Sequence, residues 1–482
     1  MVSPLLTDLY QLTMAQGYLR AGRAHDSAVF HLLFRKLPFH GGYAIAAGLE
    51  SVLAFVESFH FAEDELAYLG ALMAEDGTRL FGEDFIAYLG ALRLSLDIDA
   101  IPEGTLVFAN EPMLRVRGNL LETQLLETVL LNAINFPTLV ATKAARVCEA
   151  AGGQPVLEFG LRRAQGVDGA LSASRAAFIG GCAATSNVLA GKLYGIPVRG
   201  THAHSWVMAF DGEREAFEAY ADAMPNNCVF LVDTYDTLEG VRNAIEVGRA
   251  LRERGKRMLG IRLDSGDLAW LSNEARALLD RAGFEDAFII GSNDLDEHLI
   301  ASLKQQGASI SVWGVGTKLV TAYDQPALGG VYKLSMIGPQ GGPLAPRIKL
   351  SEQAAKTSNP GIQQVRRFSR DGRLVADAIF DEQSGCAVPT TIVDPLDPTR
   401  RRTLPAHLDQ EDLLVPVVRA GKVVAERPSL PAIQARARAQ LATLSPSVRR
   451  LLHPHEYPVG LTRELFAERL QMVERMRQQR ER

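Results

Sequence analysis

A repeating alternation of short apolar runs and helix-length segments, over residues 155 to about 335, constrains the fold more than any other feature of the sequence. The apolar runs are 156–157, 196–198, 229–232, 258–261, 288–290 and 310–312. Amphipathic segments of helical length separate most of them, such as 237–254, 268–282 and 294–306. Strand–helix alternation at about 25–45 residues per unit predicts a parallel β/α architecture, whose closed form is the (β/α) barrel.

The segments on either side of this pattern lack its regularity. Residues 1–150 mix strand-like and helical stretches and include a strongly apolar helical segment at 120–136, which is typical of an α+β domain. A Gly- and Pro-rich stretch at 338–346 marks a boundary. Residues 347–482 combine strand-like pieces with two terminal helices. The sequence therefore predicts an α/β protein with an irregular (β/α) barrel at 151–337, an α+β N-terminal domain and a smaller C-terminal region.

Composition excludes several classes of protein. The net charge of −5, from 51 basic and 56 acidic residues, disfavours general nucleic-acid binding. No apolar run in the sequence approaches the roughly 20 residues of a membrane helix, and the N-terminus lacks the basic and apolar regions of a signal peptide. Four widely spaced cysteines form no CxxC pair, which disfavours a zinc ribbon or a disulfide scaffold. We expect a cytoplasmic enzyme with no nucleic-acid or membrane partner.

Polar or small residues follow each of the six apolar runs. Because the chemistry of parallel β/α folds lies at the carboxyl ends of the strands, six such ends predict one shared polar pocket. In chain order these residues are Glu158, Arg162 and Arg163; Thr201, His202, His204 and Ser205; Asp233, Thr234 and Tyr235; Arg262, Asp264, Ser265 and Asp267; Gly291, Ser292, Asn293 and Asp294; and Gly314, Gly316 and Thr317.

The composition of this pocket favours anionic ligands. Arg162, Arg163 and Arg262 would supply charge-assisted contacts to a carboxylate or phosphate, although ion pairing within the pocket is an alternative. The GVGT segment that ends at Thr317 resembles a phosphate cradle, because glycines let backbone N–H groups approach an oxyanion. A tight turn is an equally good interpretation of GVGT alone.

Two further loops allow more than one interpretation. The SGD and GSND loops could bind anions, but Asp264 or Ser265 could instead cap a helix at 268–282, and Ser292 one at 294–306. Three carboxylates could hold Mg²⁺, which keeps several waters and shares substrate phosphates: Asp233, Asp264 and Asp267.

The histidines in GTHAHS have two interpretations. His202 and His204, two residues apart on a strand, would lie on the same face. With Asp264 they could form the metal site of a barrel hydrolase. A pocket that also contains three arginines suits anions better than a bare hydrolytic metal.

Six segments of the chain closely resemble nicotinate phosphoribosyltransferase, a type II phosphoribosyltransferase of NAD salvage. In family order, from residue 5 to 334, they are LLTDLYQLTMAQGY, EFGLRRAQGVDGALSASRAAFIGG, SNVLAGKLYGIPVRGTHAHSW, LVDTY, GIRLDSGDL and GVGTKLVTAYDQPALGGVYKL. The resemblance implies formation of nicotinate mononucleotide and pyrophosphate from nicotinate and 5-phosphoribosyl 1-pyrophosphate, coupled to ATP hydrolysis through a phosphohistidine. It also implies Mg²⁺ and a homodimer with shared active sites.

The resemblance assigns roles to individual residues. It makes His204 the phosphorylated histidine, with Asp233 or Asp264 orienting the ring. Arg262, Thr201 and, from the partner chain, Tyr10 would contact nicotinate. The flat ring and carboxylate of nicotinate require an aromatic face and an arginine. The predicted catalytic residues are His204, Asp233 and Asp264, and the predicted substrate-binding residues are Tyr10, Arg163, Thr201, Ser205, Arg262, Ser292, Gly314, Gly316 and Thr317.

Related activities are the main competing hypotheses. Nicotinamide-using relatives carry an aspartate in a stretch that here reads Thr185-Ser186-Asn187-Val188, without an acid, which favours a carboxylate substrate. Quinolinate enzymes are shorter and use no ATP. A metal-dependent hydrolase using His202 and His204 and a catalytically silent phosphosugar-binding protein are the remaining alternatives.

Overall fold

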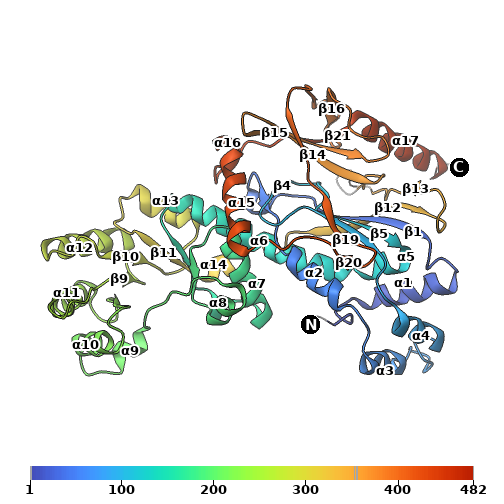
Figure 1. The fold of residues 1–482 in the computed structure, drawn as a ribbon. Helices are drawn as coiled ribbons and strands as arrows, with labels where there is room; N and C mark the ends of the chain where they lie inside the picture. Colours follow the sequence, from blue (N-terminus) through green and yellow to red (C-terminus); the bar gives the residue numbers. More distant parts are fainter. Residues whose placement is uncertain (1–2, 352, 354–356, 481–482) are drawn as a thin grey trace. The chain divides into compact units, whose positions relative to one another are not determined.

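A computed structural model of the chain describes residues 3–351, 353 and 357–480. The chain divides into two compact units (Figure 1). The first combines Met1–Leu139 with Ala327–Arg482, and the second is Val140–Pro326. The N-terminal and C-terminal segments of the sequence are therefore grouped in one unit, and most of the repeating strand–helix pattern lies in the other.

Six parallel strands form the sheet of the second unit. In spatial order they are β7 (Ala184–Thr185), β6 (Val156–Glu158), β11 (Val312–Val315), β10 (Phe288–Gly291), β9 (Gly260–Leu263) and β8 (Val229–Leu231), and every ladder between them is parallel. Five of the six predicted strands are confirmed. The sixth, at 196–198, is wrong, because this run contributes only an isolated bridge from Val198 to Thr185. The unit is thus a mixed α/β structure with a parallel sheet.

Helices connect the strands of the second unit, and aspartates cap three of them. The Asp236 carboxylate accepts a hydrogen bond from the backbone N–H of Glu239 at the start of α11 (Thr237–Glu253). Asp267 caps α12 (Leu268–Arg281) and Asp296 caps α13 (Glu297–Gln305) in the same way. The alternative capping roles considered for Asp264, Ser265 and Ser292 are therefore wrong, which leaves these residues free for the site. The remaining helices of this unit are α7 (Gly166–Ile179), α8 (Val188–Tyr194), α9 (His204–Met208), α10 (Glu213–Ala223) and α14 (Thr317–Val320).

Two larger sheets build the first unit. One has the order β13-β12-β1-β5-β3-β19-β20 and the other β17-β16-β21-β15-β14-β18. The strands of the first sheet are β13 (Ala345–Pro346), β12 (Gly330–Gly338), β1 (Ser27–Phe34), β5 (Leu114–Asn119), β3 (Asp97–Ala100), β19 (Val415–Arg419) and β20 (Lys422–Val423). Those of the second are β17 (Arg401–Leu404), β16 (Thr390–Val393), β21 (Val459–Thr462), β15 (Arg373–Asp381), β14 (Gln363–Arg370) and β18 (Asp409–Asp412). Because β1 pairs with both β12 and β5, segments from both ends of the chain share one sheet.

The helices of the first unit are α1 (Leu9–Arg20), α2 (Leu49–Ser58), α3 (Glu63–Ala71), α4 (Glu83–Ala91), α5 (Leu120–Leu125), α15 (Leu430–Thr443), α16 (Pro446–Arg449) and α17 (Arg463–Arg480). The strands β2 (Ala44–Ile45) and β4 (Leu106–Val107) form a separate two-stranded sheet. Helix α6 (Glu127–Ala151) runs from the first unit into the second. The two helices predicted near the C-terminus are confirmed as α15 and α17.

One stretch departs from the expectation of no membrane-length apolar segment. Leu120–Ala151 is long and apolar enough to cross a membrane by length and composition, with a mean hydropathy of 1.3 in its best window. Of that window, 61% is buried inside the protein, as in the core helix of a folded domain. The apolar residues of this stretch therefore serve the interior of the fold, and length and composition alone are weak evidence for a membrane span.

Candidate active site

Arg262 is the centre of a hydrogen-bonded cluster at the carboxyl ends of β9 and β10. Its Nε donates to Ser292 Oγ at 3.1 Å, its Nη1 to Thr201 Oγ1 at 3.1 Å, and its Nη2 to Asp264 Oδ1 at 3.2 Å. A guanidinium has five N–H groups. These contacts use three of them, so one N–H on each terminal nitrogen is left for a further acceptor. Two such donors in a plane match the two oxygens of a carboxylate.

An aromatic ring lies beside this guanidinium. The guanidinium carbon of Arg262 is 5.9 Å from the centre of the Phe159 ring, which follows β6. Gly314, on β11, packs against the same ring: a Cβ atom at this position would lie 2.9 Å from the Phe159 ring and 3.3 Å from Ser292 Cβ. Phe159 is not among the site residues predicted from the sequence. It could have been found as an aromatic residue directly after a predicted strand, at a position where the other predicted strands are followed by polar or small residues.

His204 lies next to the cluster, at the first position of α9. Its Nδ1 is 3.2 Å from Thr234 Oγ1, and its Nε2 is 3.8 Å from Asp264 Oδ2. The His204 side chain is 39% exposed, so a substrate can reach it. Thr234 is among the predicted strand-end residues, but no role was predicted for it. Its position directly after Asp233 was the one sequence feature that pointed to the site.

Asp233 holds the loop that carries these groups. Its Oδ2 accepts hydrogen bonds from the Asp264 backbone N–H and from Ser265 Oγ, both at 2.7 Å. Its Oδ1 is buried and has no hydrogen-bond partner among the described residues. A buried carboxylate oxygen without a donor suits a hard cation, and Mg²⁺ is commonly bound by one or two carboxylates together with substrate phosphates. The described residues contain no group of three or more His, Cys, Asp or Glu side chains that could hold a metal unaided.

His202 has a structural role that removes it from the metal hypothesis. Its Nε2 accepts a hydrogen bond from the Leu231 backbone N–H, and its Nδ1 is 3.3 Å from the Ala203 carbonyl oxygen. The ring is buried and packs against Tyr220 and Phe217. Burial lowers the pKa of His202 to about 4, so the ring is neutral near pH 7. With both nitrogens engaged, His202 has no lone pair for a metal, which argues against the hydrolase hypothesis.

The GVGT segment and the loop after β10 border the same cluster. Gly316 and Thr317 are partly buried, and Thr317 is the first residue of α14. Ser292 Oγ is hydrogen bonded to Asp264 Oδ1 at 2.5 Å. The next two residues, Asn293 and Asp294, have positive φ angles of 101° and 41°. Non-glycine residues held in this region cluster at ligand-binding sites, because the surrounding structure must over-determine them.

Three predicted site residues are exposed and are not among the residues that bond to Arg262 in the described part of the chain. Arg163 is exposed on the 3₁₀ turn Leu161–Arg163, and Ser205 is exposed on α9. Tyr10 belongs to the first unit, on α1, where its side chain is 49% exposed. All three side chains are open to a ligand or a second chain.

Two side chains of the stretch that distinguishes amide-using relatives are engaged in internal hydrogen bonds. Thr185 Oγ1 donates to the buried carboxylate of Glu158 at 2.5 Å. The Asn187 side chain accepts from the Ala190 backbone N–H and thereby caps α8. No side chain of 185–188 offers an acid to a nicotinamide group, in agreement with the expectation from sequence.

Comparisons with known proteins cover nearly the whole chain. Three family descriptions match: the nicotinate phosphoribosyltransferase N-terminal domain at residues 5–135, the nicotinate phosphoribosyltransferase family at 155–342, and the C-terminal domain at 362–469. The nicotinate phosphoribosyltransferase of Bacillus subtilis is 45% identical over 97% of this chain and 95% of its own length. The human enzyme is 39% identical over 96% of this chain and 95% of its own length.

A solved structure agrees with these matches. The crystal structure of human nicotinic acid phosphoribosyltransferase has a TM-score of 0.85 and 35% sequence identity, and the alignment covers 96% of this chain and 99% of that one. The family matches together span most of the chain, and the relatives align along almost their entire length. The chain belongs to the nicotinate phosphoribosyltransferase family.

Proposed function

We propose that this protein transfers the 5-phosphoribosyl group of 5-phosphoribosyl 1-pyrophosphate to the ring nitrogen of nicotinate, with release of pyrophosphate. The observation that carries the proposal is the Arg262 cluster, which leaves two N–H groups beside an aromatic ring. A flat ring bearing a carboxylate matches both features. The relatives named nicotinate phosphoribosyltransferase support the same reaction.

The nicotinate subsite uses three elements. Arg262 binds the carboxylate, oriented by its hydrogen bonds to Thr201 and Ser292. Phe159 provides one face for the pyridine ring. The exposed Tyr10 of a second chain provides the other, because the family resemblance assigns this tyrosine to the partner's site.

The phosphoribosyl donor binds along the GVGT segment. Gly314 and Gly316 allow close backbone approach, and Thr317 offers its hydroxyl and backbone N–H to the 5-phosphate. Arg163 and Ser205, both exposed, contribute further anion contacts. Attack by the ring nitrogen on the anomeric carbon breaks the bond to pyrophosphate, so no nucleophile from the protein is needed at the sugar.

ATP enters through His204. With a proton on Nδ1 donated to Thr234 Oγ1, Nε2 keeps its lone pair and attacks the γ-phosphate of ATP, releasing ADP. Asp264 lies close enough to Nε2 to stabilise the positive charge on the phosphorylated ring. Asp233 acts by positioning Asp264, through its hydrogen bond to the backbone of that residue.

Mg²⁺ is the proposed cofactor. Asp233 Oδ1 and the Asp264 carboxylate would hold it together with substrate phosphates. The ion supplies charge neutralisation for the departing pyrophosphate.

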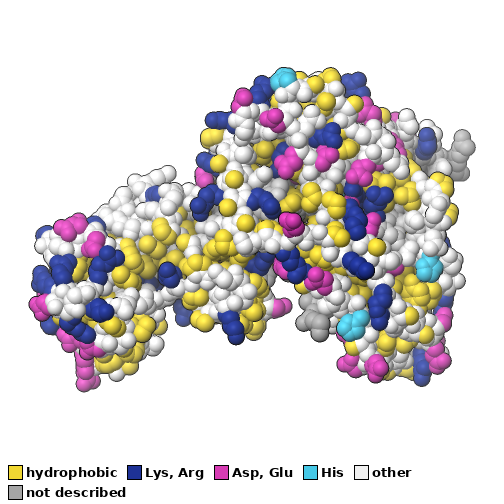
Figure 2. Space-filling view, viewed as in Figure 1, with side chains coloured by type: hydrophobic (Ala, Val, Ile, Leu, Met, Phe, Trp, Pro, Cys, Tyr) yellow, Lys and Arg dark blue, Asp and Glu magenta, His cyan; other side chains and the backbone are white. Residues whose placement is uncertain are grey.

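Two further features of the proposal concern fold and assembly. We infer that the six-stranded parallel sheet curves into an irregular, incompletely closed (β/α) barrel, as strand–helix alternation favours. We also infer a homodimer with shared sites. Exposed apolar side chains support it, and hydrophobic side chains reach the surface on the face drawn in Figure 2. Exposed apolar residues include Leu9, Tyr10 and Met14 on α1, and Val167, Val188, Leu189 and Leu193 on α7 and α8. No disulfide joins any of the four cysteines, all of which lie within the described residues, and this suits the reducing cytoplasm, the proposed location.

ATP coupling provides the test of this proposal. Nicotinate mononucleotide formation is followed with Mg²⁺, with and without ATP, and with nicotinamide in place of nicotinate. We expect product from nicotinate in both conditions, with ATP raising its rate or yield and ADP appearing alongside. The proposal would be contradicted if nicotinamide gave product at a similar rate. It would also be contradicted if the rate of ADP formation were the same with and without nicotinate and the phosphoribosyl donor.

A further inference from the structure

A cavity of about 310 Å³ lies in the first unit, and none of the residues that line it is assigned above to catalysis or substrate binding. It opens between the ends of β16 and β21 and the loop after β4. Its floor is apolar and fully buried, with Ile379, Ile392 and Leu461 no more than 3% exposed. Leu396, at its rim, is 55% exposed, so one apolar wall is uncovered.

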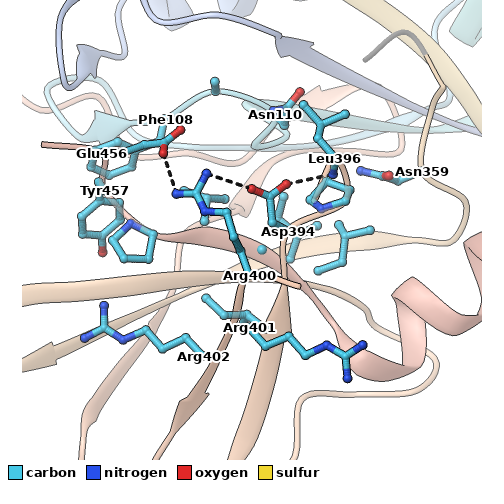
Figure 3. A pocket seen from close by; sticks show the side chains of 18 of the residues that line it. Phe108, Asn110, Asn359, Asp394, Leu396, Arg400, Arg401, Arg402, Glu456 and Tyr457 are labelled. Carbon is cyan, nitrogen blue, oxygen red and sulfur yellow. Dashed lines mark hydrogen bonds and ion pairs between the residues drawn. The ribbon is translucent and has the colours of Figure 1, made fainter. Parts of the chain in front are cut away.

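Charged groups gather at the mouth of this cavity (Figure 3). Arg400 lies between two carboxylates, 2.6 Å from Glu456 and 3.4 Å from Asp394. Arg401 and Arg402 extend in opposite directions from the same strand end. The lining thus has three arginines and two carboxylates, an excess of one positive charge.

The Arg400 ion pair can be exchanged for a ligand. The Arg400 and Glu456 side chains are 56% and 69% exposed, and an ion pair this exposed adds little to stability. Two side-chain amides, Asn110 and Asn359, also line the cavity, and neither has a hydrogen-bond partner among the described residues. The mouth therefore combines an available guanidinium with unused amide groups, above an apolar floor.

We propose that this cavity binds a small aromatic monocarboxylate. The volume is at the lower end of the range for ligand sites, about 300–1,000 Å³, and suits a single ring. The apolar floor would take the ring, and Arg400 would exchange Glu456 for the ligand carboxylate. A single excess positive charge, beside two carboxylates, favours one negative charge on the ligand over two. The site is independent of the proposed reaction.

Calorimetric titration of the full chain with benzoate tests the proposal, since benzoate has no ring nitrogen to react. We expect benzoate to bind at least tenfold more tightly than acetate, which lacks the ring, benzamide, which lacks the charge, or phenyl phosphate, which carries a second charge. Arg400→Gln should weaken benzoate binding at least tenfold. Glu456→Gln should strengthen it severalfold, because the competing carboxylate is gone. If this ion pair were merely structural, the two substitutions would not change the benzoate affinity in opposite directions.

Controls separate this cavity from other binding. Arg214 and Glu218 form another exposed ion pair, on α10, and neither Arg214→Gln nor Glu218→Gln should alter benzoate affinity. Benzoate is also a flat ring with a carboxylate and can enter the Arg262 subsite, so every titration is repeated in the Arg262→Gln background. Arg262→Gln should remove that second binding event and keep the binding at this cavity, because the Arg262 cluster is in the other unit. Absence of benzoate binding, binding lost in Arg262→Gln but kept in Arg400→Gln, or equal affinity in Arg400→Gln and Glu456→Gln would overturn the proposal.

Discussion

Replacing Arg262 should separate nicotinate recognition from the rest of the reaction. Its guanidinium makes three internal hydrogen bonds and leaves two N–H groups for the substrate carboxylate. Truncating one partner of a buried, hydrogen-bonded charge pair costs about 2–5 kcal/mol. At about 1.4 kcal/mol per factor of ten, Arg262→Ala should lower kcat/KM for nicotinate roughly 30- to 4,000-fold. Arg262→Lys should fall between this variant and the unaltered protein, since the charge remains but the planar pair of donors is lost.

Initial rates against nicotinate concentration, at saturating phosphoribosyl donor and ATP, measure this effect. The KM for the donor is the internal control and should change far less. Arg242→Ala, at an exposed arginine on α11, is the matched variant and should behave as the unaltered protein. Unchanged kcat/KM for nicotinate in Arg262→Ala, or equal losses toward nicotinate and the donor, would refute the assignment of Arg262 to the carboxylate.

Three further outcomes are expected. His204→Ala should abolish acid-labile labelling from γ-labelled ATP and leave ATP-independent transfer, whereas labelling that survives in His204→Ala and vanishes in His202→Ala would reverse the assignment. Mixing Tyr10→Ala with His204→Ala under subunit exchange should restore ATP-coupled activity, because one site of each mixed dimer then carries neither change; no recovery despite proven exchange would exclude shared sites. The pKa of His202 is lowered to about 4 in the fold, so the stability from its neutral ring is fully present above about pH 6.5 and is lost as the pH falls toward 4. The free energy of unfolding, measured by urea denaturation, should therefore fall between pH 7 and pH 4.5 by about 2.5 kcal/mol less in His202→Gln than in the unaltered protein. An equal fall in both proteins would contradict the structural role of this ring.

Hydrophobic periodicity predicted the strands of the second unit well. Buried parallel strands read as short apolar runs between amphipathic helices, and five of the six runs form the sheet. The run at 196–198 failed because two neighbouring residues, Ala184 and Thr185, take the edge position instead, and nothing in their composition indicates a strand. Hydrophobic periodicity also could not predict that β1 pairs with β12, because these strands are some 300 residues apart in the sequence.

Site residues were predictable where motif and strand end coincide. Arg262, Asp264, Thr201 and Ser292 are brought together by hydrogen bonds, as one polar pocket requires. The family resemblance selected His204, but residue type and spacing did not distinguish it from His202. The structural role of His202 depends on the Leu231 backbone and on the aromatic rings around it. The helix caps were misassigned for a similar reason: each loop contains several carboxylates or hydroxyls, and only the backbone path decides which one reaches the helix N-terminus.

A competition between the two pyridine bases tests the central claim most directly. The purified protein receives 5-phosphoribosyl 1-pyrophosphate, ATP, Mg²⁺ and equal concentrations of nicotinate and nicotinamide, and the products are identified by mass spectrometry. We predict nicotinate mononucleotide and pyrophosphate in equal amounts, with nicotinamide left unchanged. Nicotinamide mononucleotide as the main product, or consumption of the donor without any pyridine nucleotide, would contradict the account.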